Sequence, residues 1–217
     1  RNEKGWKVST LGKYTEFLTS GSRGWAEHYA EEGDWFFRIQ NVGRGEMLLN
    51  DVQRVKAPTT QEAERTRVQP GDLLMSITAD LGRTAVVPDG TPTAYINQHL
   101  ALIRLKGIDP LYVSHYFATP YGQAVIQKRN KSNVKAGLNF NDIKSFPLVV
   151  PSAAAQEEYS KTVFRIRALR GAMQTSLVNL EQLCGSLSQR AFKGELSVTT
   201  SASNESVGVT PTAIIVQ

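Results

Sequence analysis

"SAAAQEEYSKTVFRIRALRGAMQTSLVNLEQLCGSLSQRAFK", residues 152–193, contains no proline, and its apolar residues recur with a heptad spacing. This spacing predicts one long helix with an apolar stripe along one face. At about 1.5 Å per residue the helix would extend about 60 Å, and a domain of about 150 residues cannot bury such a stripe alone. We therefore expect a partner helix, either from a second copy or from a sister segment. The alternative is an ordinary long helix folded back on the core. The stripe consists of Ile166, Leu169, Met173, Leu177, Leu180, Leu183 and Leu187.

The residues before this helix indicate a strand-rich domain. Stretches of β-branched and aromatic residues, bounded by glycine, proline and aspartate turns, predict strands. The expected strands lie within 35–42, 67–78, 83–88, 94–106 and 145–151, and a helix broken near Pro120 follows Pro110. Gly194 is placed to cap the long helix. The predicted fold class is α+β, with domains at 1–150 (globular), 151–196 (long helix) and 197–217 (flexible Ser/Thr-rich tail).

Composition excludes several classes of protein. Of the residues, 41% are hydrophobic and 21% are charged, which is typical of a folded chain. No apolar run approaches the roughly 18 residues of a membrane helix, and the N-terminus lacks the apolar core of a signal peptide. We therefore expect a cytoplasmic protein, and the missing initiator methionine is compatible with excision from a longer chain. A single cysteine and three scattered histidines predict neither a disulfide nor a metal site.

The basic surplus of residues 1–150 lies in one window, 123–144, where five basic residues face Asp142 alone. The window also contains asparagine and glutamine, and these residue types together are common in contacts to phosphates and base edges. A solvated lysine-rich loop is the alternative interpretation. The candidate nucleic-acid contacts in the window are Lys128, Arg129, Asn130, Lys131, Asn133 and Lys135.

A second set of candidates begins in a loop before the first predicted strand. The small residues Ser20, Gly21 and Ser22 with Arg23 can bring backbone amides and a guanidinium close to phosphates. Trp25, Tyr29, Trp35 and Phe36 would anchor this loop to the core. Candidate base-reading residues follow on a strand and turn, and a further loop adds two more. These are Arg38, Gln40, Asn41 and Arg44, and then Thr78 and Arg83.

No local motif indicates catalysis. "ATPYG" at 118–122 lacks residues that an adenine-methyltransferase loop requires, and no glycine-rich loop follows a strand to hold S-adenosylmethionine. "VPDG" at 87–90 is not followed by the acidic residue and lysine of a nuclease metal motif. Asp72, beside Pro70-Gly71, is interpreted as a turn carboxylate. The sequence therefore predicts a non-catalytic protein that holds no cofactor of its own.

The order of motifs resembles the specificity subunits of Type I restriction-modification systems. The resemblance covers residues 5–196, and departures from the usual junction are a reversed Gln156-Glu157 pair and Tyr159 in place of an aliphatic residue. The motifs are "GWKVSTLG" (5–12), "GSRGWAEHYAEEGDWFFRIQNV" (21–42), "VQPGDLLMSITADLGRTAVV" (68–87), "NQHLALIRL" (97–105), "FPLVVPS" (146–152) and "SQRAFKGEL" (188–196).

The resemblance implies a target-recognition domain that reads half of a split double-stranded DNA sequence, followed by a spacer helix. Family members usually carry two such units, whereas this chain carries one, so it is expected to act as a half-subunit. Its helix would then pair as an antiparallel coiled coil with a second copy or a sister half. The implied partners are an adenine methyltransferase subunit, which would bind S-adenosylmethionine, and a restriction subunit. Alternatives are a recognition domain excised from a single-chain enzyme and a coiled-coil scaffold that does not bind DNA.

Overall fold

The computed structural model describes residues 5–129 and 137–196, and the remaining residues are not discussed structurally. The predicted tail at 197–217 and four basic-window candidates, Asn130, Lys131, Asn133 and Lys135, lie outside the described residues. By internal contacts the chain divides into two units, residues 1–165 and 166–217, each considered by itself.

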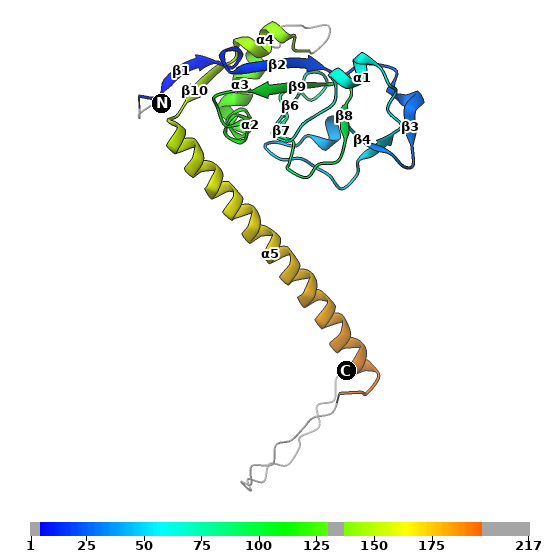
Figure 1. The fold of residues 1–217 in the computed structure, drawn as a ribbon. Coiled ribbons are helices and arrows are strands. Elements are labelled where there is room, and N and C mark those ends of the chain that lie inside the picture. Colours follow the sequence, from blue (N-terminus) through cyan, green and yellow to red (C-terminus); the bar gives the residue numbers. More distant parts are fainter. Residues whose placement is uncertain (1–4, 130–136, 197–217) are drawn as a thin grey trace. The chain divides into compact units, whose positions relative to one another are not determined.

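The first unit contains ten strands and several short helices among its described residues (Figure 1). The strands are β1 (Lys7–Thr10), β2 (Thr15–Ser20), β3 (Tyr29–Ala30), β4 (Asp34–Phe37), β5 (Gln53–Val55), β6 (Leu73–Ser76), β7 (Thr84–Val86), β8 (Ala94–Ile96), β9 (Leu100–Leu105) and β10 (Pro147–Val150). The α-helices are α1 (Gln61–Arg65), α2 (Pro110–Ala118), α3 (Pro120–Arg129) and α4 (Phe140–Ser145), and short 3₁₀ helices occur at Leu11–Lys13, Trp25–His28 and Ile39–Asn41.

The strands form three sheets. A central sheet has the order β2-β9-β6-β7, a second sheet has the order β3-β5-β4-β8, and β1 pairs with β10. All pairs are antiparallel except β4 with β8. Every residue of β6 is buried because both faces of the central sheet are covered.

Alternate residues of the central strands point into two different cores. Leu73 and Met75 face a core shared with helices α2, α3 and α4, which also contains Phe117. Leu74 lies in a second core with Phe37 and Ile96 of the other sheet. This alternation is the period of two expected for a strand buried on both faces.

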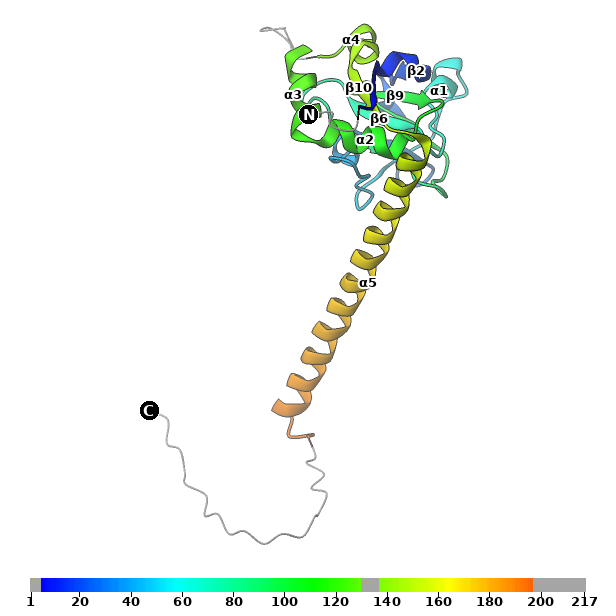
Figure 2. The same ribbon diagram turned by 90° about the vertical axis from the view of Figure 1, so that its left-hand side faces the viewer.

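The helices cover one face of the central sheet. Helix α2 packs against β7 and against α3, and Figure 2 shows α2 and α3 side by side. Asp109 caps α2, accepting hydrogen bonds on Oδ1 from the amides of Leu111 and Tyr112. The helices are separated at Thr119, before Pro120, so the predicted break is confirmed.

Two of the expected strands are interrupted by polar residues. Residues 35–42 were expected to be one strand, but β4 ends at Phe37 and Ile39–Asn41 form a 3₁₀ helix, because Asn41 folds back to accept a hydrogen bond from the Arg38 amide. Residues 94–106 split at Asn97–His99 into β8 and β9, which belong to different sheets. Polar side chains that bond to nearby backbone compete with a strand ladder in this way.

Helix α5 (Ala153–Phe192) is continuous over the stretch with heptad spacing. Its first turns are tied to the first unit: Gln156 Oε1 accepts from the Asp109 amide at 2.8 Å, and Ser160 Oγ donates to Asp109 Oδ2 at 2.6 Å. Gln156 and Ser160 are the buried residues of the helix. In the reversed Gln156-Glu157 pair, the side-chain amide of Gln156 therefore binds the Asp109 backbone and holds the start of α5 in place.

Neither α5 nor any other described helix carries a stretch long and apolar enough to cross a membrane.

Candidate nucleic-acid interface

Strand register brings several candidate loops to one edge of the central sheet. Ser20, at the end of β2, pairs with Ala101 near the start of β9, and Leu100 pairs with Ser76, the last residue of β6. Met75 pairs with Thr84, the first residue of β7. The loops after β2, between β6 and β7, and before β9 therefore leave the sheet on the same side.

The second sheet contributes the segment after β4 to the same place. Phe37 pairs in parallel with Ile96, and the Asn97 amide donates to the Phe37 carbonyl at 3.1 Å. Ser22 also forms a parallel bridge with Asn97. We name these loops together the loop edge, defined as residues 20–24, 38–46, 77–83 and 97–99. The edge contains candidates from three separate regions of the sequence.

The Ser20–Arg23 loop lies against the chain backbone. The Gly21 amide donates to the Leu100 carbonyl, and a Cβ at Gly21 would lie 2.2 Å from the Asn97 carbonyl oxygen, so only glycine fits there. Trp25 Nε1 donates to Ser22 Oγ at 3.0 Å. Arg23 is exposed, and within the part of the chain that the structure describes its side chain has no ion-pair partner. The loop is thus held firmly while its arginine remains available.

The aromatic residues expected to anchor this loop divide into two groups. Trp25 is stacked on Phe36 at 4.9 Å between ring centroids, and both are buried in a third core with Tyr95. Tyr29, in contrast, is 42% exposed. Only part of the expected anchor is therefore in the core.

Asn41 is buried, and its side chain is committed to its own loop. Nδ2 donates to the carbonyls of Leu48 at 3.0 Å and Asp51 at 2.7 Å, and Oδ1 accepts from the Arg38 amide at 2.9 Å. A base contact would require these bonds to break. The arrangement fits a supporting role for Asn41 beneath Arg38 and Gln40, whose side chains both approach Asp51.

Arg44 is the exposed residue between two buried glycines, Gly43 and Gly45. The Gly43 amide donates to the Glu46 carbonyl at 2.9 Å, and the Gly45 amide donates to the Thr84 carbonyl at 2.7 Å. Among the described residues, nothing forms an ion pair with the Arg44 guanidinium. The backbone on either side of this arginine is therefore fixed and its charge is unneutralised, which suits contact with an anionic or acceptor-rich ligand.

The loop between β6 and β7 is fastened at several points. Ser76 Oγ accepts from the Arg83 amide, and Arg83 Nε donates to Asp80 Oδ2 at 2.5 Å. A guanidinium nitrogen of Arg83 also approaches the Val42 carbonyl at 3.5 Å, which joins this loop to the one that holds Arg44. Ala79 has φ of 57°, the left-handed region that costs roughly 1–2 kcal/mol for a residue with a Cβ.

The turn Asn97–His99 belongs to the loop edge, although the sequence predicts only a strand for these residues. His99 Nδ1 and Thr78 Oγ1 lie 2.6 Å apart, and Gln98 Nε2 lies 3.0 Å from His99 Nε2. Three polar residues between two apolar strands were the signal for this turn.

Two described residues of the basic window, Gln123 and Gly137, contact the loop edge. Gln123 of α3 donates to the Gly82 carbonyl at 2.8 Å, and Gly137 forms a bridge with Thr78. Lys128 and Arg129 are exposed at the end of α3. Gln123 and Gly137 are therefore adjacent to the loop between β6 and β7.

Asp72 has the turn role predicted for it. Its Oδ2 accepts from the Gln69 amide at 2.7 Å, and its two oxygens accept from Arg104 at 2.8 and 2.9 Å. The hydrogen bond from Arg104 to Asp72 raises the pKa of that guanidinium, which keeps it charged. Asp72 is buried and fully used in the fold.

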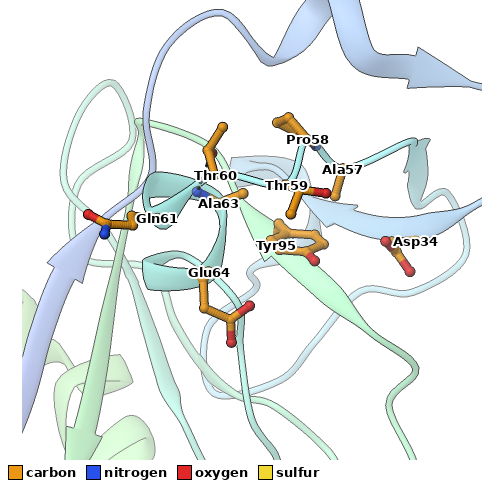
Figure 3. Close-up of a pocket in the computed structure, with 9 residues that line it drawn as sticks. All are labelled: Asp34, Ala57, Pro58, Thr59, Thr60, Gln61, Ala63, Glu64 and Tyr95. Atoms are coloured by element: carbon orange, nitrogen blue, oxygen red, sulfur yellow. Dashed lines mark hydrogen bonds between the residues drawn. The ribbon is translucent and has the colours of Figure 1, made fainter.

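A pocket of about 520 Å³ lies between the second sheet and α1, and Figure 3 shows its lining. None of its lining residues belongs to the loop edge. Tyr95 forms its floor, with Asp34 and Glu64 on either side of the ring. Burial, followed by the Asp34 carboxylate, raises the pKa of Tyr95, so its hydroxyl stays protonated. Across residues 5–129 and 137–196 no group of histidine, cysteine and acidic side chains could hold a metal ion.

The apolar stripe of α5 is exposed within the second unit. Its seven residues are between 44% and 73% exposed, with Met173 the highest. Leu169, Met173 and Leu177 also line a shallow apolar depression on the helix surface. Exposure of this extent along one helix face is typical of a surface that binds a partner.

Comparisons with known proteins point to one family. The Escherichia coli protein "Type I restriction enzyme EcoBI specificity subunit" is 24% identical to this chain over 182 residues. The HsdS subunit of Thermoanaerobacter tengcongensis superposes with a TM-score of 0.53 and 20% identity, and covers 90% of this chain. The chain has the fold of half a Type I specificity subunit.

Two further structures show the same fold. The S subunit of the Type I restriction-modification system from M. genitalium has a TM-score of 0.54 at 16% identity over 89% of this chain. A chain from a structure of a Type I restriction-modification system, studied for its assembly and conformational transition, has a TM-score of 0.56 at 19% identity. No protein-family model matches the sequence.

This chain spans 38% of the E. coli specificity subunit and 47–48% of the solved chains. The matches confirm the resemblance to specificity subunits and the predicted fold class, a strand-rich mixed domain followed by one long helix. The E. coli relative is named as a specificity subunit, and two of the solved chains are named as an HsdS subunit and an S subunit.

Proposed function

We propose that this chain is a sequence-specific double-stranded DNA recognition subunit of a Type I restriction-modification complex, and that it reads one half of a bipartite target. The observation that carries the proposal is the meeting of arginine-bearing loops from three regions of the sequence around Asn97. Arginine, glutamine and asparagine side chains on rigid loops are suited to base edges in the major groove. The similarity to specificity subunits supports the same function.

The candidate residues fall into two groups, those that contact bases and those that contact phosphates. Arg44, Arg38 and Gln40 read bases, Asn41 holds their loop, and Thr78 and Arg83 form a second reading loop. The Ser20–Arg23 loop and the basic window, with Lys128 and Arg129 at its described end, contact phosphates. Phosphate contacts set register and affinity, and base contacts set sequence choice.

In this proposal helix α5 pairs as an antiparallel coiled coil with a second copy or a sister half and sets the gap between two half-targets. The complex also contains an adenine methyltransferase subunit, which binds S-adenosylmethionine and receives the flipped adenine, and a restriction subunit. Its site of action is the cytoplasm. The exposed stripe from Ile166 to Leu187 is the surface that supports pairing.

The experiment is selection from random DNA duplexes with the purified chain, alone and with a candidate adenine methyltransferase subunit. We expect enrichment of a bipartite motif with a fixed gap, and a palindromic motif if two identical copies bind together. Enrichment of a single ungapped half would favour a recognition domain excised from a single-chain enzyme. The alternative is a coiled-coil scaffold that does not bind DNA, which the exposed stripe of α5 would also fit. It would be favoured if no motif were enriched in either condition and if binding to partner proteins did not depend on salt.

A further inference from the structure

Two hydrogen bonds through His115 link the loop that holds Arg44 to the first turns of α5. His115, on α2, lies between them: its Nε2 is 3.0 Å from the Gly45 carbonyl oxygen, and its Nδ1 is 2.7 Å from the Tyr159 hydroxyl. The three residues come from distant parts of the sequence. Tyr159 is also the position at which the sequence departs from the aliphatic residue usual in specificity subunits.

The chemistry of the three groups decides which atom donates and which accepts in each of the two hydrogen bonds. The carbonyl of Gly45 can only accept, so His115 Nε2 carries a proton and donates to it. In the neutral ring Nδ1 is then an acceptor, and the Tyr159 hydroxyl donates to it. Tyr159 therefore orients the imidazole, and the imidazole in turn holds the peptide that follows Arg44.

Packing leaves the imidazole little freedom. The Tyr159 ring meets His115 edge-on at 5.8 Å and meets Tyr112 edge-on at 5.9 Å. Gly45 has φ of 93°, and a Cβ there would lie 2.8 Å from His115 Cδ2. The loop and the ring are therefore in direct contact, and a shift of one moves the other.

A further hydrogen bond joins β7 to Ser114, the neighbouring residue of α2. Thr84 Oγ1 donates to the Ser114 carbonyl at 2.8 Å, while the Thr84 carbonyl accepts from the Gly45 amide. Gly45 is thus held through its amide by β7 and through its carbonyl by α2. The support through His115 continues to Tyr159 of α5.

We propose that Tyr159 is a positioning residue for DNA reading, which sets the place of Arg44 through His115 and Gly45. The inference rests on the proposed function, because it assigns Arg44 to base contact. In consequence the start of the spacer helix takes part in sequence choice as well as in spacing. A chain with an aliphatic residue at this position would lack the donor that orients His115.

The test compares Tyr159→Phe with Tyr112→Phe in the full chain, by base-resolved selection from random duplexes with the methyltransferase subunit present. Tyr112→Phe is the matched control, because it also removes a hydroxyl from the same aromatic cluster. The Tyr112 hydroxyl donates to the Val149 carbonyl at 2.8 Å, and not to His115. Tyr159→Phe should lower discrimination at the base read by Arg44 by about two- to tenfold, the usual effect of one hydrogen bond. Tyr112→Phe should leave discrimination unchanged.

Combination with Arg44→Ala separates positioning from general loosening. If Tyr159 acts through Arg44, the double variant should discriminate no worse than Arg44→Ala alone. The inference would be overturned if the losses of base discrimination in the double variant were additive, or if Tyr159→Phe discriminated as the wild type does. In both cases a motif selected by the wild-type chain would still support the proposed function. Absence of any motif from the wild-type chain would instead count against the proposed function.

Discussion

At the scale of single residues, the loop edge contains two kinds of side chain: buried ones that hold the loops in place, and exposed ones that are available to a ligand. Asn41 and Arg44 are three positions apart, yet one is buried with three hydrogen bonds and the other is exposed between two glycines. From residue type alone, both are predicted to contact bases. Burial divides them, because both amide hydrogens of Asn41 are used within its own loop and cannot be offered to a ligand without loss of those bonds.

Replacement of Asn41 by alanine should therefore reduce stability. The carbonyls of Leu48 and Asp51 and the Arg38 amide would lose their partner, at a cost of about 2–3 kcal/mol in the free energy of unfolding. Urea denaturation measures this loss. The matched control is Gln40→Ala, an exposed change on the same loop that should alter stability by less than about 0.5 kcal/mol. Equal effects of the two changes would contradict the supporting role.

The exposed arginines should differ in what they contribute to DNA binding. Arg44→Ala should cost about 1–3 kcal/mol at one base position and relax the sequence choice there. Arg23→Ala should weaken binding to all sequences evenly and lower the salt slope by about one. Titrations of target and non-target duplexes at several salt concentrations distinguish the two. An even loss from Arg44→Ala would remove it from the base-reading group.

At the scale of elements, α5 carries a stripe that one helix cannot bury. In an antiparallel pair centred on Ile166–Leu187, Leu169 of one copy faces Cys184 of the other, while the two Cys184 residues are roughly 20 Å apart along the axis. A disulfide requires Cα atoms within about 7 Å. Leu169→Cys should therefore form an oxidised dimer, and the wild-type chain should not, as seen on a non-reducing gel. A wild-type dimer linked through Cys184 would indicate parallel pairing.

The length of α5 should set the gap in the target. Duplication of residues 173–186 adds two heptads and keeps the stripe in register. This adds about 21 Å of helix, or roughly six base pairs at about 3.4 Å each, to the unread gap. The control is an insertion of the same length after Glu195, beyond the helix, which should leave the gap unchanged. Selection from random duplexes reads both gaps directly, and an unchanged gap in the duplication would disprove the role of the helix as a ruler.

At the scale of the whole molecule, a chain with one recognition domain needs a second to read a bipartite target. Leu180→Glu places a charge in the middle of the stripe, where pairing would have to bury it at high cost. Because Leu180 is 58% exposed in the single chain, the variant should fold normally. We expect it to sediment as a monomer and to select one half-site, where the wild type selects two. A monomeric variant that still selected a gapped palindrome would refute pairing through this helix.

The amino-acid sequence by itself determined the long helix, the strand-rich domain before it and the break near Pro120. Each of these rests on a local pattern, either heptad spacing, β-branched clusters or a residue that cannot continue a helix. Only the tertiary structure decided which candidates lie together, because strand register and sheet order bring residues 20–24, 38–46, 77–83 and 97–99 to one edge. It also decided that Asn41 is buried and that Tyr159 reaches His115. Such contacts join residues far apart in the chain, so no local spacing records them.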